Sequence, residues 1–115
     1  MFLFPWLLAI LLALLDEWVS TILLRCEYTH HRLAWESDGK PRGVFWIPDE
    51  CRIGWYITYA SGHAAQIVKF KWLLKTPDWM ANNSQAHRLL TFHRLLLPSF
   101  VACLIAPFVI ALLLQ

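Results

Sequence analysis

The chain ends in a run of twenty residues, Leu95 to Leu114, that contains no charged side chain. At a rise of about 1.5 Å per residue, a helix of this length spans about 30 Å, the thickness of the hydrocarbon core of a bilayer. The whole chain has only 115 residues, too few to enclose such a rod in a soluble core. We therefore predict a transmembrane helix over residues 95–115, with Pro107 in its interior as a kink.

A second apolar region opens the chain. Residues 2–15 are all apolar, Asp16 and Glu17 follow, and the sequence is again largely apolar up to Leu24. No basic residue precedes Arg25 and no small-residue cleavage site follows the apolar run, which argues against a secretory signal peptide. Residues 1–24 are therefore predicted to form an uncleaved transmembrane helix.

Asp16 and Glu17 lie roughly two thirds of the way along this first helix. A carboxylate at the centre of a membrane helix costs on the order of 3 kcal/mol, and less near the interface. Two interpretations follow. The acids face a partner helix, a cation or a proton path inside the membrane, or they reach the headgroup region and meet Arg94 of the second helix. The second interpretation is the simpler one and we favour it.

Both predicted membrane helices carry small residues at spacings of three and four, which places them on one face and lets helices approach closely. We expect these faces to be helix interfaces, formed either with each other or with a second copy. Together with the two acids and Arg94, the polar candidates for such an interface are Ser20, Ser99 and Cys103. The apolar members of the two stripes are Ala9, Ala13, Ala102 and Ala106.

The orientation follows from the basic residues. All ten Lys and Arg lie between Arg25 and Arg94, and with six acids in the same region this segment carries a net charge of +4. The positive-inside rule therefore places residues 25–94 in the cytoplasm and both termini on the far side.

The middle segment has a mainly helical pattern. Residues 25–35 are expected to continue the first helix, and Gly39 and Pro41 mark a turn after it. Residues 43–47 are short and apolar, which suits an extended segment on the membrane surface. A helix is predicted from Asp49 towards Lys75, with its apolar face at Ile53, Tyr56, Ala60, Ala64, Ile67, Phe70 and Leu74.

Further along, Pro77 is expected to begin a short helical turn. Ser84 is then predicted to cap a last helix that runs unbroken from Gln85 into the membrane. The expected fold is thus an all-α membrane protein of two transmembrane helices joined by about 70 residues, mainly helical and associated with the membrane.

Aromatic and basic side chains alternate in this middle segment. Tyr and Trp rings favour headgroup depth and Lys side chains reach past them to water, so we expect a helix lying on the inner leaflet. Nucleic-acid binding is the competing explanation, but the small net charge beside a bilayer argues against it. The candidate membrane-surface residues are Trp35, Trp46, Trp55, Lys69, Lys71 and Trp72.

The sequence offers no recognisable catalytic or metal motif. Cys26 and His30 share a helical face, but zinc requires three or four ligands with paired spacing. Neither a phosphate-binding glycine loop nor a defensible arrangement of Ser, His and acid is present. We therefore expect no enzyme activity, no cofactor and no metal. Three cysteines, two of them on the predicted cytoplasmic side, argue against disulfides.

The order of these segments resembles the universal stress protein B group of small bacterial inner-membrane proteins. The likeness rests on His31, Trp35, Gly39 and Pro41 at their spacing, then on Phe70-x-Trp72, and on Arg94 before the last anchor. The resemblance implies a protein of the bacterial inner membrane linked to stress physiology, and it implies no mechanism.

Composition and resemblance together predict a small integral membrane protein with a non-enzymatic role. It would bind lipid and another membrane protein or a further copy of itself, organise the membrane, and take no part in nucleic-acid binding. The alternative hypothesis is a pore or ion pathway built from several copies and lined by Asp16 and Glu17.

Overall fold

The computed structural model describes residues 3–115, and within them every regular element is helical. Two long helices lie at the two ends of the chain and shorter ones lie between them. In chain order the elements are α1 (Leu3–His30), α2 (Arg32–Ser37), the 3-10 turn η1 (Asp49–Cys51), α3 (Trp55–Leu74), α4 (Asp78–Ala81) and α5 (Ser84–Leu113).

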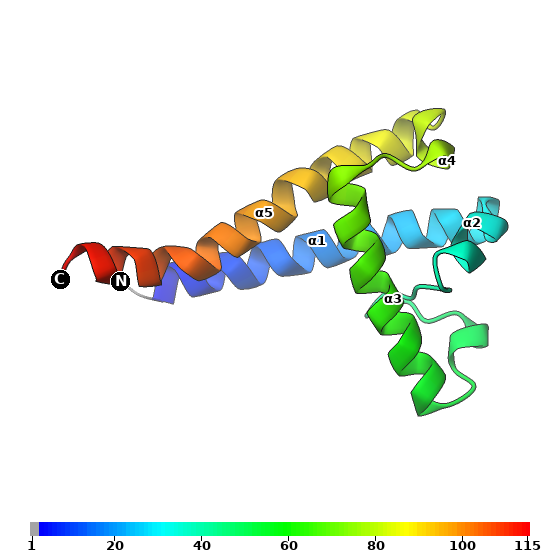
Figure 1. The fold of residues 1–115 in the computed structure, drawn as a ribbon, viewed down its shortest axis with the longest axis horizontal. Coiled ribbons are helices and arrows are strands. Elements are labelled where there is room, and N and C mark those ends of the chain that lie inside the picture. The colour runs from blue at the N-terminus through cyan, green and yellow to red at the C-terminus, as the bar shows by residue number, and fades with distance from the viewer. Residues whose placement is uncertain (1–2) are drawn as a thin grey trace.

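Helices α1 and α5 run antiparallel and form a long hairpin whose free end carries both termini (Figure 1). Each helix is long and apolar enough to cross a membrane. We call residues 3–15 and 95–113 the shaft, and the remainder, residues 16–94, the head. The molecule is 52 Å long in its greatest dimension, so it exceeds the hydrocarbon core of a bilayer by about 20 Å.

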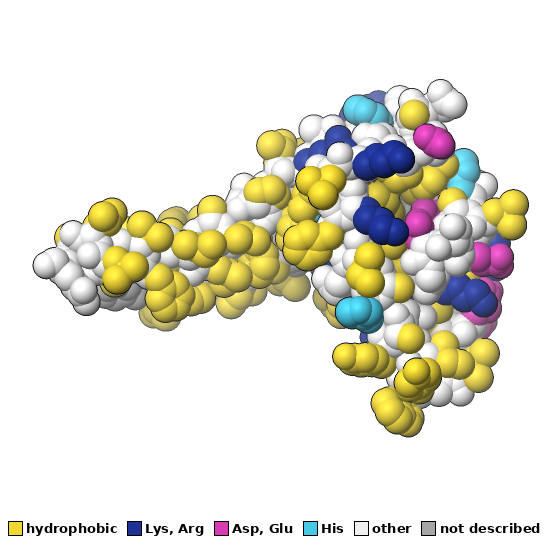
Figure 2. Space-filling view, in the orientation of Figure 1, with side chains coloured by type: hydrophobic (Ala, Val, Ile, Leu, Met, Phe, Trp, Pro, Cys, Tyr) yellow, Lys and Arg dark blue, Asp and Glu magenta, His cyan; other side chains and the backbone are white. Residues whose placement is uncertain are grey.

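The shaft is covered with exposed apolar side chains, as the space-filling view shows (Figure 2). In the most apolar stretch of α5 only 6% of the residues are buried, against 39% in α1. The core helix of a soluble protein would be mostly buried. Most of the surface of this stretch of α5 is not covered by any other described part of the chain.

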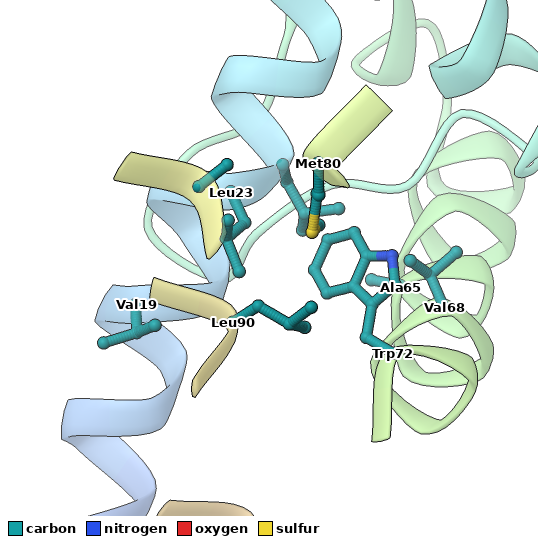
Figure 3. Close-up of a cluster of buried hydrophobic side chains, with 9 residues drawn as sticks. Val19, Leu23, Ala65, Val68, Trp72, Met80 and Leu90 are labelled. Atoms are coloured by element: carbon teal, nitrogen blue, oxygen red, sulfur yellow. The ribbon is translucent and has the colours of Figure 1, made fainter. Parts of the chain in front are cut away.

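The head has a conventional hydrophobic core where α3 crosses the hairpin (Figure 1). Trp72 of α3 lies at its centre, close to Leu23 of α1, Met80 of α4 and Leu90 of α5 (Figure 3). All four side chains are at most 2% exposed. Burying each one contributes roughly 1.5–3 kcal/mol, so this cluster fixes α3 against both long helices.

A tight turn brings the chain back towards α3 after α2. Gly39 and Lys40 both have positive φ angles, 91° and 56°, and the first of these is a conformation that favours glycine. A Cβ atom on Gly39 would also lie 3.2 Å from the Cβ of Ala64 in α3. The indole nitrogen of Trp35 donates to the carbonyl of Pro41 over 2.8 Å and holds the turn closed.

Three local predictions differ from the structure. The first helix does not continue to residue 35 but breaks at His31, whose backbone is not helical, before α2 begins. Residues 43–47 are not extended, because the Gly43 amide donates to the carbonyl of Trp46 and folds the segment on itself. The N-cap of α5 is Asn83 rather than Ser84, since its side chain accepts a hydrogen bond from the Ala86 amide. Helix α5 does run unbroken to Leu113, through Pro98 and Pro107.

Helix α3 begins at Trp55, later than predicted, and its expected apolar face is not the one that packs on the protein. The buried face holds Ser61, Ala65, Val68 and Trp72. The predicted stripe is largely exposed, with Phe70 at 66% and Leu74 at 90%. The helix therefore has two apolar faces, and only one of them meets the rest of the chain.

Candidate functional site

Five polar side chains meet where α3 crosses the hairpin, at the boundary between shaft and head. We call this group the polar junction: Asp16, Glu17 and Ser20 from α1, Lys69 from α3 and His93 from α5. Asp16, Ser20, Lys69 and His93 are all buried. A charge in such a place costs several kcal/mol unless it is paired, so the pairing within the junction decides whether the fold tolerates it.

His93 is the centre of the junction and is fully buried. Its Nε2 lies 2.9 Å from the backbone carbonyl of Lys69. A carbonyl only accepts hydrogen bonds, so Nε2 carries a proton. Its Nδ1 lies 2.6 Å from Oδ1 of Asp16, too close for two bare acceptors, so a second proton is shared between these atoms. Whichever atom holds that proton, the pair has no net charge.

This arrangement does not form a catalytic triad although it contains Ser, His and Asp. The hydroxyl of Ser20 lies 3.4 Å from Nδ1 of His93, the same nitrogen that faces Asp16. In a hydrolase the serine and the acid sit on opposite ring nitrogens, so that the base accepts a proton from one side while oriented from the other. Here the second nitrogen is occupied by a backbone carbonyl. These contacts link α1, α3 and α5 to one another.

Glu17 and Lys69 form the second pair of the junction. The ammonium of Lys69 donates to Oε2 of Glu17 over 2.5 Å, and the Val44 amide donates to Oε1 over 2.9 Å. Their side chains are only 14% and 7% exposed. Both carboxylate oxygens are thus satisfied within the chain, and the contact ties α1 to α3 and to the loop before η1.

The predicted contact between the acids and Arg94 is not formed. Arg94 instead donates from Nε to the carbonyl of Trp72 and from Nη2 to the hydroxyl of Thr76. It therefore closes the C-terminal end of α3, where unpaired carbonyls attract a cation. Asp16 and Glu17 pair instead with His93 and Lys69, because those two residues lie on the inner faces of α5 and α3.

The small-residue faces are only partly used within the chain. Ala9 and Ser20 of α1 are buried against α5. On α5, Cys103 is half-buried, whereas Ser99 is exposed and donates to its own helix at the carbonyl of Leu95. The stripe of α5 is therefore turned partly away from α1.

The expected membrane-surface residues separate into two groups. Trp55 is 82% exposed and Lys71 is exposed, while Trp46 is half-buried. Trp35, Lys69 and Trp72 are buried, and for these three the prediction was wrong. Trp72 fills the core and Trp35 closes the turn after α2, because a large ring in a small head supplies apolar area that few other residues can provide.

A buried acid, Glu27, lies at the far end of the head. Its Oε2 accepts from the indole of Trp79 over 2.9 Å, and Oε1 has no partner among the described residues. Burial, and after it the neighbouring Asp38 carboxyl, raises the pKa of Glu27 to about 9. Glu27 is therefore protonated at neutral pH and anchors α4 as a neutral group.

Sequence reasoning missed His93 and Glu27 as structural residues, and also Arg42, whose Nε donates to the backbone carbonyl of Thr58. None of the three is an isolated polar residue in an apolar run, since His93 precedes Arg94, Arg42 follows Lys40, and Glu27 follows Arg25, so no local pattern singled them out. Within residues 3–115, no three His, Cys, Asp or Glu side chains gather in a way that would hold a metal ion.

Comparisons of the chain with models of protein families, with curated proteins and with solved structures found no match. The resemblance to the universal stress protein B group stays a prediction.

Proposed function

We propose that this chain is an integral membrane protein with a non-enzymatic, membrane-organising role. The shaft spans the bilayer as a helical hairpin. The head lies on the cytoplasmic side, with α3 at headgroup depth. The observation that carries the proposal is the exposed apolar surface of the shaft, which ends where the polar junction begins.

The placement of charge supports this orientation. Neither part of the shaft contains a charged residue, whereas all ten Lys and Arg belong to the head. Figure 2 shows the basic side chains at the broad end of the molecule and apolar ones along the narrow end. Lipid tails solvate apolar side chains, whereas water and headgroups solvate basic ones.

Helix α3 supports headgroup depth for the head. Gln66 and Phe70 of α3 line a cavity together with Ala13, Leu97 and Phe100 of the long helices. This side of α3 therefore faces the shaft. Lys71 and Lys75 line a different cavity, together with Asp38 and Asp78 of the head. An interfacial helix is expected to show this division, with rings towards the acyl chains and lysines towards water.

The proposal is tested by labelling engineered cysteines in sealed vesicles with a membrane-impermeant maleimide. The three native cysteines are first replaced by Ser, and single cysteines are placed at Lys71, Ile105 and Leu114. We expect position 71 to react only from the cytoplasmic face and position 114 only from the other. Position 105 should react only after detergent is added.

A chain that washes off the vesicles at alkaline pH, with position 105 reactive throughout, would contradict membrane insertion. Reaction of positions 71 and 114 from the same face would contradict a spanning hairpin. Arg52→Cys serves as the matched control, since that residue is exposed and belongs to the head.

The pore hypothesis makes a separate prediction. Conductance through a channel lined by Asp16 and Glu17 would require both acids to leave their partners His93 and Lys69. The intramolecular pairing therefore favours the membrane-organising role. Ion flux in reconstituted vesicles that disappears in the Glu17→Gln variant would support the pore instead.

A further inference from the structure

A further cavity lies beside the polar junction, between α3 and the loop that precedes η1. Its volume is about 310 Å³. On α3 it is lined by Tyr59, Gly62, His63, Gln66 and Lys69, and from the rest of the chain by Glu17, Arg42 and Val44. It thus combines two cations, one carboxylate and neutral polar groups in a space that suits a small polar headgroup.

Arg42 is fixed at the edge of this cavity by its own framework. Its Nε donates to the carbonyl of Thr58 over 2.8 Å and its Nη1 to the carbonyl of Gly43 over 3.1 Å. The guanidinium lies against Gly62, where an added Cβ would meet Nη2 at 3.0 Å. Glycine at this position lets the guanidinium lie close to α3 without displacement.

The framework leaves Arg42 with donors to spare. A guanidinium has five N–H groups in a planar fork, and no carboxylate of the described residues lies within ion-pair distance of Arg42. Both bonds that it does make are to backbone carbonyls, which do not neutralise it. A planar cation with free donors matches the oxygens of a phosphate group.

The remaining charges of the cavity do not cancel Arg42. Glu17 is the only carboxylate in the lining, and its two oxygens accept from Lys69 and from the Val44 amide. Lys69 and Glu17 therefore neutralise each other, and the cavity keeps a surplus of one positive charge. His63 is exposed beside it and adds a further donor.

The cavity adjoins a smaller one that borders the apolar shaft. Tyr59, His63, Gln66 and Phe70 follow at spacings of four and three, so they share one side of α3. Gln66, Lys69 and Glu17 line this cavity and also the smaller one that borders Leu97 and Phe100. A lipid whose headgroup lies in the cavity beside Arg42 would thus have its acyl chains beside the apolar surface of the shaft.

We propose that this cavity binds the phosphate of an anionic glycerophospholipid, held by Arg42 with His63 and Gln66, with its acyl chains running along the shaft. The inference rests on the membrane insertion proposed above and adds a ligand class and a site to it. The bound lipid would fix the depth of α3 in the headgroup layer.

The test titrates the full-length chain, in a neutral detergent, with phosphatidylglycerol or phosphatidylcholine and counts bound lipids by native mass spectrometry. We expect phosphatidylglycerol to bind about tenfold more tightly, because phosphatidylcholine offers the same phosphate together with a choline cation that the surplus positive charge of the cavity repels. His63→Glu should remove this preference, because it adds a carboxylate at an exposed position whose side chain holds no other element in place. His87→Glu, which makes the same change at an exposed site on α5, should leave the preference intact.

A second pair of variants guards against misfolding. Arg42→Gln should lower the affinity for phosphatidylglycerol by about tenfold or more, and Arg88→Gln, an equal loss of charge at an exposed position, should change it less than about twofold. Helical content by circular dichroism is measured on the same samples, and the labelling of position 105 is measured on the same variants in sealed vesicles. Soluble glycerol phosphate in large excess should not displace the lipid, because it has no acyl chains.

Equal binding of the two lipids, or equal loss in both members of a pair, would overturn the site. Displacement of the lipid by glycerol phosphate would overturn the assignment to a lipid. These outcomes with position 105 still protected would leave the membrane proposal intact, whereas loss of protection in the unaltered chain would contradict the membrane proposal itself.

Discussion

The shaft and the head share helices α1 and α5, yet the exposed side chains of these helices differ between the two regions. In the head, α1 and α5 bury Leu23 and Leu90 and pair their polar groups with other elements. In the shaft, large side chains such as Leu7, Ile105 and Phe108 are more than half exposed. On the side of α1 that faces α3, the change occurs within one turn, at Asp16 and Glu17. A single helix can therefore serve as core and as lipid-facing surface when its polar residues mark the boundary.

The largest effect is expected from breaking that boundary at His93. His93→Leu removes the partner of Asp16 and leaves a buried carboxylate unpaired, which costs about 3–5 kcal/mol of unfolding free energy. Hydrogen exchange should show faster opening of α3, while the shaft keeps its protection. His87→Leu is the control, since His87 is exposed. Equal stability of the two variants in detergent would show that the junction does not hold the head together.

Arginine substitutions at two matched apolar positions test whether lipid surrounds the shaft. Ile105 in the shaft is 51% exposed and Ile53 in the head is 76% exposed. An arginine at the centre of a membrane helix costs about 3 kcal/mol on insertion scales. Ile105→Arg should therefore reduce the inserted fraction in a microsome insertion assay, and Ile53→Arg should not. A reduction of the same size in both would mean that the two surfaces face the same solvent.

Within the head, Glu27 gives a pH dependence of known sign. Its pKa is about 9 in the folded protein, against an ordinary value of 4.5. Between these values the folded state keeps a proton that the unfolded chain releases, so stability falls as pH rises through this window. Glu27→Gln should remove this slope and raise the unfolding free energy at pH 8 by about 1–3 kcal/mol.

The measurement is thermal unfolding in detergent from pH 5 to pH 9. Glu36→Gln is the matched control, because Glu36 is exposed on α2 and its replacement should leave the pH slope as it is. A slope that survives in Glu27→Gln would contradict the assignment.

The smallest effect is expected at the start of α5. Asn83→Ala removes the side-chain oxygen that accepts from the Ala86 amide, at a cost of about 1 kcal/mol. Asn82→Ala changes the preceding, exposed residue and should cost less. Thermal unfolding of the two variants compares them directly, and equal midpoints would argue against capping by Asn83.

The long elements were predictable because each depends on a pattern that lies along the chain. The uncharged run before Leu114 and the run after Met1 predict two long apolar helices, and the structure has them as α5 and α1. The turn at Gly39 follows from residue type alone. Membrane insertion and orientation stay predictions that the vesicle experiment addresses.

The site was less predictable because it depends on residues distant in sequence. Asp16 meets His93, 77 positions away, and Glu17 meets Lys69, 52 positions away. Periodicity predicted a single apolar face of α3, from Ile53 to Leu74, and a different face of the helix packs on the protein. The buried face combines the large Trp72 with the small Ser61 and Ala65. Whether such a face fits the long helices depends on its shape, which composition does not encode.

The apolar part of α1 ends at different heights on its two sides. On the side of α3, the thirteen residues from Leu3 to Leu15 give only about 20 Å before the first acid, less than a typical hydrocarbon thickness. Away from α3, exposed Trp18 and half-buried Ile22, one turn further along, extend the apolar surface by about 10 Å. Hydrophobic mismatch of this kind is relieved by tilting the hairpin or thinning the leaflet locally. The protein should therefore deform the bilayer on one flank only, and partition preferentially into thinner membranes.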